Sequence, residues 1–301
     1  SFYVDGASAG GGNLGGAPVS SSANFYIGGR QGDTIRQFNG LIDDVRIYNR
    51  ALSANEIATL YNSGAAKFNV SPTKYLTSGL VGYWTMDGSK INWATGEVTD
   101  SSGKGNTGTI VNMVTSTAVA AGKIGQALNF DGVDDYVDAG SGSAAINNLN
   151  TFSWSFWMKP NTLGEINNGA VMDRTAVNPT VVRKRIVIRN SPASSIALVV
   201  DRTTNTDCNS AANTVELGVW QHYVFTYTED AGGKIYKNGS EASYGTCTVG
   251  SGSTVDDSDA NIIIGNDISA SQTFNGPIDD VRVYNRALSA SEIQLLYNVG
   301  K

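Results

Sequence analysis

Two nearly identical stretches of sequence decide the fold: FNGPIDDVRVYNRALSASEIQLLYNVG at positions 274–300 and FNGLIDDVRIYNRALSANEIATLYNSG at positions 38–64. They agree at 21 of 27 positions. In the later copy, the apolar residues between Ile278 and Tyr284 predict a β-strand. The spacing of Ser289 and Glu292 then predicts a capping box that starts a short helix, which Gly300 ends. Each copy is therefore expected to close with the same strand and helix.

The repeat extends upstream of both stretches. Tyr3-Val-Asp-Gly6 corresponds to Tyr236-Lys-Asn-Gly239, and Phe25-Tyr-Ile-Gly28 corresponds to Ile262-Ile-Ile-Gly265. The first copy therefore begins partway through a domain. Three segments are predicted: residues 1–64 as the C-terminal part of a first domain, 65–78 as a linker, and 79–301 as a complete second domain.

Composition favours an all-β protein. The 301 residues include 35 glycines and 6 prolines, and charged residues make up 16% of the chain. Many short strands joined by polar turns have such a composition. Ten or more strand signals lie between residues 80 and 284, and a two-sheet sandwich with one terminal helix accounts for them.

Charge and hydropathy exclude two classes of partner. The net charge is −6, and the richest basic stretch, residues 181–186, has the alternation of a strand, so nucleic acid is not expected as a partner. No apolar stretch is long enough for a transmembrane helix, so membrane insertion is not expected. The chain starts at Ser1 with neither a basic nor an apolar leader, which is typical of a mature product or an excerpt.

Six motifs precede the closing stretch in the later copy. They are GLVGYWTMD (79–87), DSSGKGN (100–106), GQALNFDGVDDYV (125–137), FSWSFWMK (152–159), GVWQHYV (218–224) and YKNG (236–239). With the closing stretch, this series resembles the bacterial laminin-G-like domain of the concanavalin A-like lectin/glucanase superfamily. The resemblance implies a jelly roll of two antiparallel sheets in a secreted or cell-surface protein, often with bound calcium and sometimes with a glycan ligand.

The two cysteines, Cys208 and Cys247, lie in polar segments with no metal-binding partner nearby in the sequence. A disulfide between them is the simplest interpretation, and it favours an extracellular, oxidising location. The alternative is two unrelated thiols in polar loops.

The resemblance also implies a calcium site. Calcium prefers six to eight oxygen ligands, so acidic side chains near polar turns are expected to supply them. Asp87, at the end of the first strand, and Asp279 and Asp280, in the last strand, form the predicted set. Alternatively, Asp279 and Asp280 cap a turn or pair with arginines. A second acidic cluster, Asp131, Asp134, Asp135 and Asp138, is more typical of turn formation.

Trp93 is the predicted ligand-contacting residue, because its loop lacks strand periodicity and its ring could stack on a sugar. Enzymatic activity is not expected, since the sequence lacks the paired carboxylates with which glucanases of this superfamily act. His222 is interpreted as a structural residue.

The predicted function is therefore a non-catalytic extracellular module that binds a glycan. The alternatives are an adhesion or spacer repeat that contacts extracellular proteins and, less favoured, a glycosidase. Residues 1–64 are interpreted as a retained piece of a longer protein or as a strand donor that mediates self-association.

Overall fold

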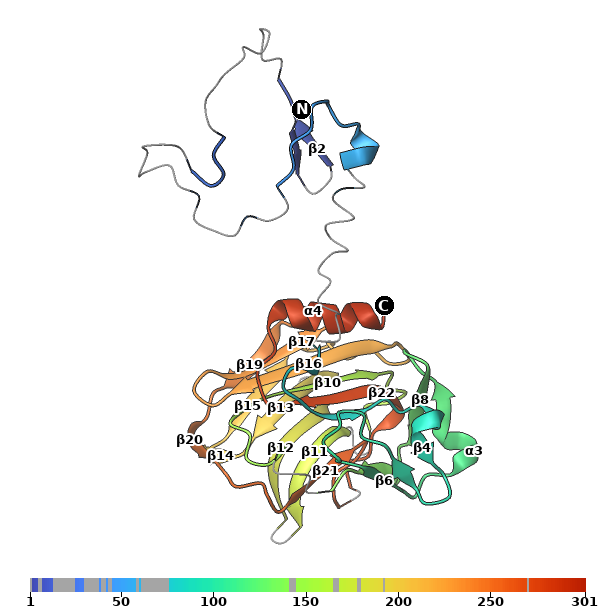
Figure 1. Cartoon of the computed structure of the whole chain (residues 1–301). Coiled ribbons are helices and arrows are strands. Elements are labelled where there is room, and N and C mark those ends of the chain that lie inside the picture. Colours follow the sequence, from blue (N-terminus) through green and yellow to red (C-terminus); the bar gives the residue numbers. More distant parts are fainter. Residues whose placement is uncertain are drawn as a thin grey trace. The chain divides into compact units, whose positions relative to one another are not determined.

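The computed structural model describes residues 2–4, 7–12, 25–29, 38, 42, 45–57, 60, 76–140, 145–164, 168–177, 180–191, 193–269 and 271–301 (Figure 1). The chain divides into two compact units, an N-terminal unit of residues 1–72 and a C-terminal unit of residues 73–301. The predicted linker, 65–78, lies outside the described residues as far as position 75. No helix among the described residues is long and apolar enough to cross a membrane.

The C-terminal unit is a sandwich of two antiparallel sheets. The eight-stranded sheet contains β18 (Ser240–Glu241), β17 (Gly232–Lys237), β16 (Gln221–Thr228), β10 (Thr151–Met158), β22 (Asn275–Tyr284), β8 (Gln126–Asp131) and β7 (Val119–Ala121) in that order, with β3 (Leu80–Trp84) also paired to β22. The ten-stranded sheet runs β19 (Tyr244–Thr248), β15 (Thr206–Ser210), β13 (Ser195–Val200), β12 (Thr180–Arg189), β11 (Ala170–Val177), β21 (Ala260–Ile264), β9 (Tyr136–Asp138), β6 (Gly108–Val111), β5 (Glu97–Val98) and β4 (Ile91–Asn92). The predicted two-sheet jelly-roll sandwich is confirmed.

Short elements join and flank the sheets. They are η1 (Gly88–Lys90), α3 (Thr115–Ala118), the pair β14 (Arg202–Thr204) and β20 (Ser251–Thr254), and the terminal helix α4 (Ala290–Val299).

Alternate residues of the strands fill the space between the two sheets. In β10, Phe152, Trp154 and Phe156 belong to the main core, while Ser153 and Ser155 face the opposite side. Phe152 stacks on Tyr227 of β16, with 5.2 Å between the ring centroids. Each fully buried side chain of this size contributes about 1.5–3 kcal/mol to stability, so the paired strands are held mainly by this layer.

The closing strand and helix have the predicted form. β22 pairs with β10 along one edge and with β3 and β8 along the other. The Ser289 side chain accepts a hydrogen bond from the Glu292 N–H, and the Glu292 side chain completes the capping box. Arg286 forms an ion pair with Glu292 at 2.6 Å.

Helix α4 covers the outer side of the eight-stranded sheet (Figure 1). A second apolar cluster lies beneath it: Leu76, Leu80, Val224, Tyr236, Tyr284, Leu288, Ile293 and Leu296. This cluster anchors the start of the domain, through Leu76 and Leu80, to its end.

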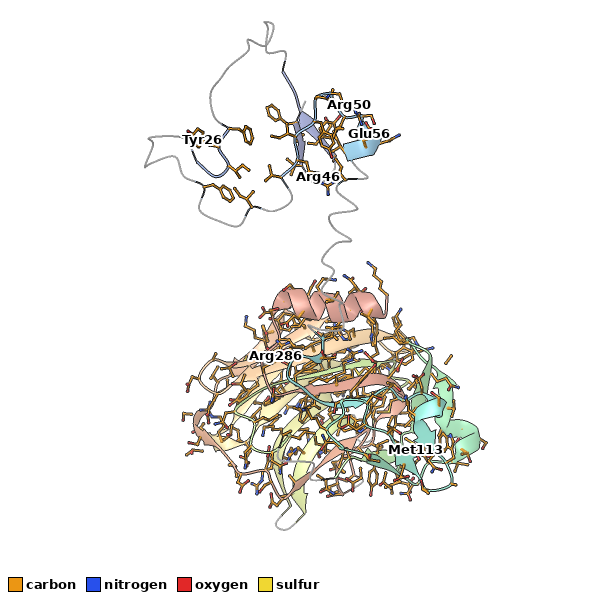
Figure 2. The ribbon with its side chains drawn as sticks, viewed as in Figure 1. Tyr26, Arg46, Arg50, Glu56, Met113 and Arg286 are labelled. Atoms are coloured by element: carbon orange, nitrogen blue, oxygen red, sulfur yellow. A yellow bond between two sulfur atoms is a disulfide. The ribbon has the colours of Figure 1, made fainter. Side chains whose placement is uncertain are left out.

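The N-terminal unit repeats local parts of this fold. Strands β1 (Phe2–Val4) and β2 (Ala7–Gly10) form an antiparallel pair. Residues 54–57 are helical, and the Ser53 N–H donates to Glu56 Oε2 at 2.8 Å. Arg50 pairs with Glu56 at 2.6 Å, as Arg286 pairs with Glu292. Figure 2 shows these side chains among those of both units.

Candidate functional site

A row of polar side chains crosses the outer face of the ten-stranded sheet. Ile186 and Ile188 of β12 enter the main core, so Arg185 and Arg189, at alternate positions, lie on the opposite side. Neighbouring strands add polar residues to the same side. The resulting polar face comprises Asp138 of β9, Asp173 of β11, Arg185 and Arg189 of β12, Asp207 and Asn209 of β15, and Asn261 of β21.

Arg189 reaches across strand β13 to two residues of β15. Its guanidinium donates to Asp207 Oδ1 at 2.9 Å and to Asn209 Oδ1 at 2.8 Å. The strand between them carries Ala197 opposite Asn209, and this small side chain leaves room for the guanidinium to cross. The side chains of Arg189 and Asp207 are 25% and 40% exposed, so their remaining polar atoms can contact a ligand.

Arg185 is the centre of a second group on the polar face. It donates to Asp173 Oδ2 at 2.8 Å and to Gln272 Oε1 at 2.6 Å. Asp173 is fully buried, and burial raises the pKa of its carboxyl group, although Arg185 and Thr175 oppose the shift. Asp173 therefore holds Arg185 in place and cannot itself touch a ligand.

A third pair continues the polar face. Asn261 of β21 donates from Nδ2 to Asp138 Oδ2 of β9 at 3.0 Å. Together, the three groups present planar donors and acceptors whose orientations are fixed by bonds to one another. Such groups suit a ligand that carries many hydroxyls, since each planar group can bond two of them and loses little side-chain freedom on binding.

A family model assigns the chain to a group with this architecture. The model described as "Concanavalin A-like lectin/glucanases superfamily" matches residues 1–58 and 131–294. The chain belongs to this superfamily. The matched residues include the whole polar face of the C-terminal unit. Membership of this superfamily, together with the polar face, supports a role as a binding module.

Solved structures share the superfamily fold. Domain 4 of AbnA, a GH43 extracellular arabinanase from Geobacillus stearothermophilus in complex with arabinotriose, is 24% identical with a TM-score of 0.51; the match covers 73% of this chain and 98% of that one. The binding domain of Paraclostridial Mosquitocidal Protein 1 is 17% identical with a TM-score of 0.54, over 74% and 53% of the two chains. The botulinum neurotoxin serotype G binding domain is 15% identical with a TM-score of 0.55, over 73% and 51%.

This chain spans about half the length of the two toxin binding domains. At these identities, the likeness shows the fold. No curated protein matches the sequence.

The residues predicted to bind calcium hold a loop in place. Asp279 Oδ2 accepts backbone hydrogen bonds from Lys123 and Ile124, each at 2.8 Å. Asp87 Oδ1 accepts one from the N–H of Gln126 at 2.9 Å. The structure thus brings Asp87 and Asp279 to the same loop, 122–126, where both carboxylates are already engaged by N–H donors.

Asp280 is set apart from the other two by a β-bulge. Its φ is 51°, and the register of β22 against β10 shifts at this point. The Asp280 carboxylate accepts from Arg282 at 3.0 Å, and the Arg282 guanidinium lies 4.4 Å from the Tyr83 ring centroid. A guanidinium in this position repels a cation near Asp280, whereas Asp87 and Asp279 hold the loop. Calcium binding by these three residues stays a prediction.

The second acidic cluster has a geometry closer to that of a cation site. Oxygen atoms of Asp131, Asp134 and Asp135 lie within 4.8 Å of one another, and no other group of three acidic, histidine or cysteine residues in the described part of the chain does so. Asp131 Oδ1 also accepts from the Val133 N–H at 2.8 Å, which is the predicted turn-forming role. Burial and the charges of Asp131 and Asp134 raise the pKa of Asp135.

The remaining predicted residues have clear positions. Trp93 is half-buried in the turn between β4 and β5 and packs against the main core, so ligand contact by Trp93 stays a prediction. Cys208 and Cys247 face each other on β15 and β19 and form the predicted disulfide. The alternative of two unrelated thiols is therefore wrong.

His222 lies in the interior of the C-terminal unit. It is 1% exposed, and its Nε2 lies 3.0 Å from Ser155 Oγ. Its ring centroid is 5.0 Å from that of Trp157. Burial, with a smaller contribution from the charge of Arg282, lowers its pKa to about 3. A neutral, enclosed imidazole has a structural role.

Sequence reasoning missed the polar face itself. Its only signal is the alternation of Arg183, Arg185 and Arg189 in β12, which marks one side of a strand as polar. The partners of these arginines come from other strands, and no local pattern identifies them.

Proposed function

We propose that the protein is a non-catalytic, extracellular carbohydrate-binding module whose glycan contacts the polar face. The observation that carries this proposal is the partly exposed Arg189, which is hydrogen-bonded to Asp207 and Asn209 on the polar face that also holds Arg185. A glycan offers hydroxyl pairs that can accept from the arginines and donate to the carboxylates. Because these side chains are already fixed, binding orders few additional groups.

Two further findings support this proposal. The AbnA domain of the same fold was solved with arabinotriose, an oligosaccharide. The disulfide between Cys208 and Cys247 is compatible with an oxidising, extracellular compartment.

Two carboxylates of the polar face, those of Asp173 and Asp207, do not suit glycoside hydrolysis. That reaction needs one carboxyl group as acid and another as nucleophile or base on either side of the bond. Asp173 is fully buried and paired with Arg185, and Asp207 is paired with Arg189. This pairing supports binding without catalysis.

Calcium belongs to the proposal as the ion expected from the superfamily. Asp131, Asp134 and Asp135 fit it better than Asp87, Asp279 and Asp280, because no guanidinium pairs with any of the three among the described contacts. An ion there would offset the repulsion among the three carboxylates and stabilise the turn between β8 and β9.

A second candidate function is adhesion to an extracellular protein without a glycan. The repeat of the closing stretch at 38–64 favours it, since tandem copies are typical of surface proteins. This alternative predicts no sugar binding at all.

A glycan array probed in calcium and again in chelator tests the proposal. We expect saturable binding to a small set of glycans. Arg189→Ala should weaken binding at least tenfold, because a charged hydrogen-bonding residue at the centre of a site commonly contributes more than 1.4 kcal/mol. Lys234→Ala is the matched control, since Lys234 is an exposed cation on the eight-stranded sheet, paired with Glu241. Silence on the array, or equal loss in both variants, would reject the polar face as the site.

A further inference from the structure

Each arginine on the outer side of β12 is paired with a carboxylate. The shortest nitrogen–oxygen distances lie between 2.8 and 3.5 Å, for Arg185 with Asp173, Arg189 with Asp207, and Arg183 with Asp201. The last of these pairs borders the polar face, and the other two belong to it. A negatively charged ligand would therefore find each of these guanidinium groups already beside an anion.

Carboxyl groups outnumber guanidinium groups at this face. Three more acids lie on it or at its border, namely Asp138, Asp259 and Asp267. Asp259 and Asp267 each have an oxygen 3.8 Å from one of the same arginines. The described residues of the face and its border thus hold six carboxyl groups and three guanidinium groups. Even with Asp173 protonated, since burial raises its pKa, the face carries an excess of negative charge.

The most accessible charges at this face are negative. The side chains of Asp207 and Asp259 are 40% and 54% exposed. Those of Arg183, Arg185 and Arg189 are 13%, 13% and 25% exposed. A ligand that approaches the face therefore meets a negative potential before it reaches a guanidinium group.

The arginines are held too firmly to turn toward a new anion. Val187 lies between Arg185 and Arg189 on the same side of β12, and it is only 2% exposed, so the surrounding side chains pack closely over it. Asp173, the partner of Arg185, is fully buried. Moving the Arg185 guanidinium to an acidic ligand would leave this carboxyl group buried without its partner, which is strongly unfavourable.

An uncharged sugar avoids both the repulsion and the loss of an ion pair. A hydroxyl group can donate one hydrogen bond and accept others. It can therefore donate to the partly exposed carboxylate of Asp207 and accept from Arg189 while the ion pair between them stays intact. The ion pairs then act as fixed hydrogen-bonding groups, and the ligand brings no further negative charge to the face.

We propose that the polar face selects uncharged glycans and rejects glycans that carry carboxylate or sulfate groups. The inference rests on the proposed function and narrows its ligand to one chemical class. Rejection follows from the negative charge of the face and from the existing partners of the arginines, because specificity arises as much from repelling one ligand as from attracting another.

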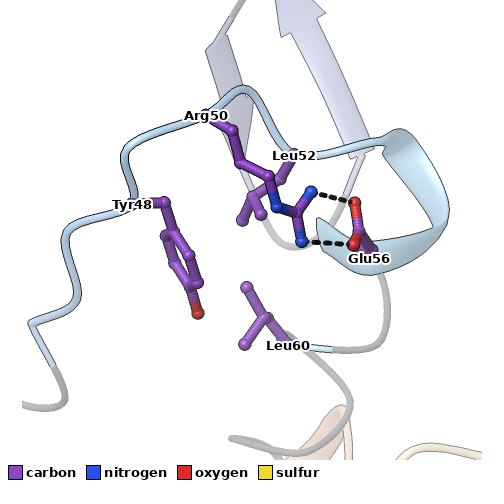
Figure 3. A pocket seen from close by; sticks show the side chains of 5 residues that line it. All are labelled: Tyr48, Arg50, Leu52, Glu56 and Leu60. Atoms are coloured by element: carbon purple, nitrogen blue, oxygen red, sulfur yellow. Dashed lines mark hydrogen bonds and ion pairs between the residues drawn. The ribbon is translucent and has the colours of Figure 1, made fainter.

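A pocket in the N-terminal unit would make a different choice (Figure 3). It has a volume of about 240 Å³, and its lining residues are Tyr48, Arg50, Leu52, Glu56 and Leu60. The Arg50 side chain pairs with Glu56 and is 56% exposed, whereas that of Arg189 is 25% exposed. An acidic sugar could therefore reach the Arg50 guanidinium with its ring against that of Tyr48. The charge of the bound glycan thus separates the polar face from this pocket.

A glycan array that carries neutral, uronate-containing, sialylated and sulfated glycans tests the selectivity. The full chain is applied to it, and each neutral glycan that binds is then compared in solution with its carboxylated or sulfated derivative. We expect the parent protein to bind uncharged glycans. The acidic derivatives should bind about tenfold more weakly, or not at all, because like charges placed side by side oppose binding.

Replacing Asp207 tests the cause of the selectivity. Asp207→Asn removes one carboxylate and leaves the Arg189 guanidinium without its anion. We expect the preference for an uncharged glycan over its acidic derivative to fall about tenfold. Asp230→Asn is the matched control, because it removes the same charge from an exposed turn and should not change the preference. Melting temperatures close to that of the parent check that both variants are folded.

A preference of the parent for acidic glycans would overturn the inference and leave carbohydrate binding standing. Loss of that acidic binding in Tyr48→Ala would then move the site to the pocket of the N-terminal unit. Equal preferences in Asp207→Asn and Asp230→Asn would overturn the inference as well. Silence toward every glycan would instead reject the proposed function on which the inference rests.

Discussion

Replacing Asp279 by asparagine separates two roles for this carboxyl group, a loop clamp and a metal ligand. Asp279 is 0% exposed, and its Oδ1 has no hydrogen-bond partner among the described residues. Burial, assisted by the charge of Asp280, raises its pKa from 3.8 to about 7, although the backbone N–H groups oppose the shift. The folded protein therefore keeps this proton to a much higher pH than the unfolded chain.

The size of the effect follows from proton linkage. Between the unfolded pKa of 3.8 and the folded pKa of about 7, the unfolded chain binds fewer protons, so the free energy of unfolding falls as pH rises. The contribution of Asp279 is fully present below pH 3.8 and lost above about pH 7. At about 1.36 kcal/mol per unit, the total loss is roughly 4 kcal/mol.

Asparagine mimics the protonated acid. Its Oδ1 can still accept from the N–H groups of Lys123 and Ile124, and it carries no charge. In chelator, we expect Asp279→Asn to match the parent near pH 4 and to be more stable by roughly 2–4 kcal/mol at pH 8.

Urea unfolding followed by tryptophan fluorescence at pH 4, 6 and 8 measures this difference. Asp230→Asn, at an exposed turn, controls for the loss of one negative charge. Parallel pH profiles for parent and Asp279→Asn would refute the raised pKa of the Asp279 carboxyl group. Calcium that stabilises the parent and fails to stabilise Asp279→Asn would instead support the predicted ligand set.

Three further predictions concern stability. Asp135→Asn should abolish any rise in melting temperature caused by calcium, whereas the control Lys234→Ala should keep it. An equal rise in both variants would exclude Asp131, Asp134 and Asp135 as a calcium site. The double variant Cys208→Ser, Cys247→Ser should lower the free energy of unfolding by roughly 2–4 kcal/mol, because the disulfide no longer closes a loop between cysteines 39 positions apart in the unfolded chain. A loss below 1 kcal/mol in a urea titration would contradict this. Gly125→Ala should lower the free energy of unfolding by about 2–3 kcal/mol, because Gly125 has a positive φ and a methyl group there would press against Asp87. Gly103→Ala should lower it by only about 1 kcal/mol, because Gly103 also has a positive φ but has open space around it. Equal melting temperatures of the two variants would refute the contact with Asp87.

Much of the fold could be predicted because its signals are local. The capping box at Ser289 joins groups three residues apart, and the alternation between Ile278 and Tyr284 is written in consecutive residues. The two cysteines allow one intramolecular pairing, and it is the pairing observed. The series of motifs identifies the superfamily in the same way, since each motif lies within about a dozen residues.

The candidate site depends on distant contacts and could not be predicted. Arg185 meets Gln272, 87 positions away, and Asp279 meets the N–H of Lys123, 156 positions away. The bulge at Asp280, which turns two adjacent acids to different partners, depends on the pairing of β22 with β10.

The repeated closing stretch separates the two levels most clearly. The sequence by itself determined the capped helix and the Arg–Glu pair, which form in both copies because their groups are neighbours along the chain. Tertiary structure alone decided burial: Ile47 is 73% exposed, and its counterpart Val283 is 0% exposed. The physical reason is that a side chain leaves water only where other strands cover it, and those strands lie elsewhere in the chain.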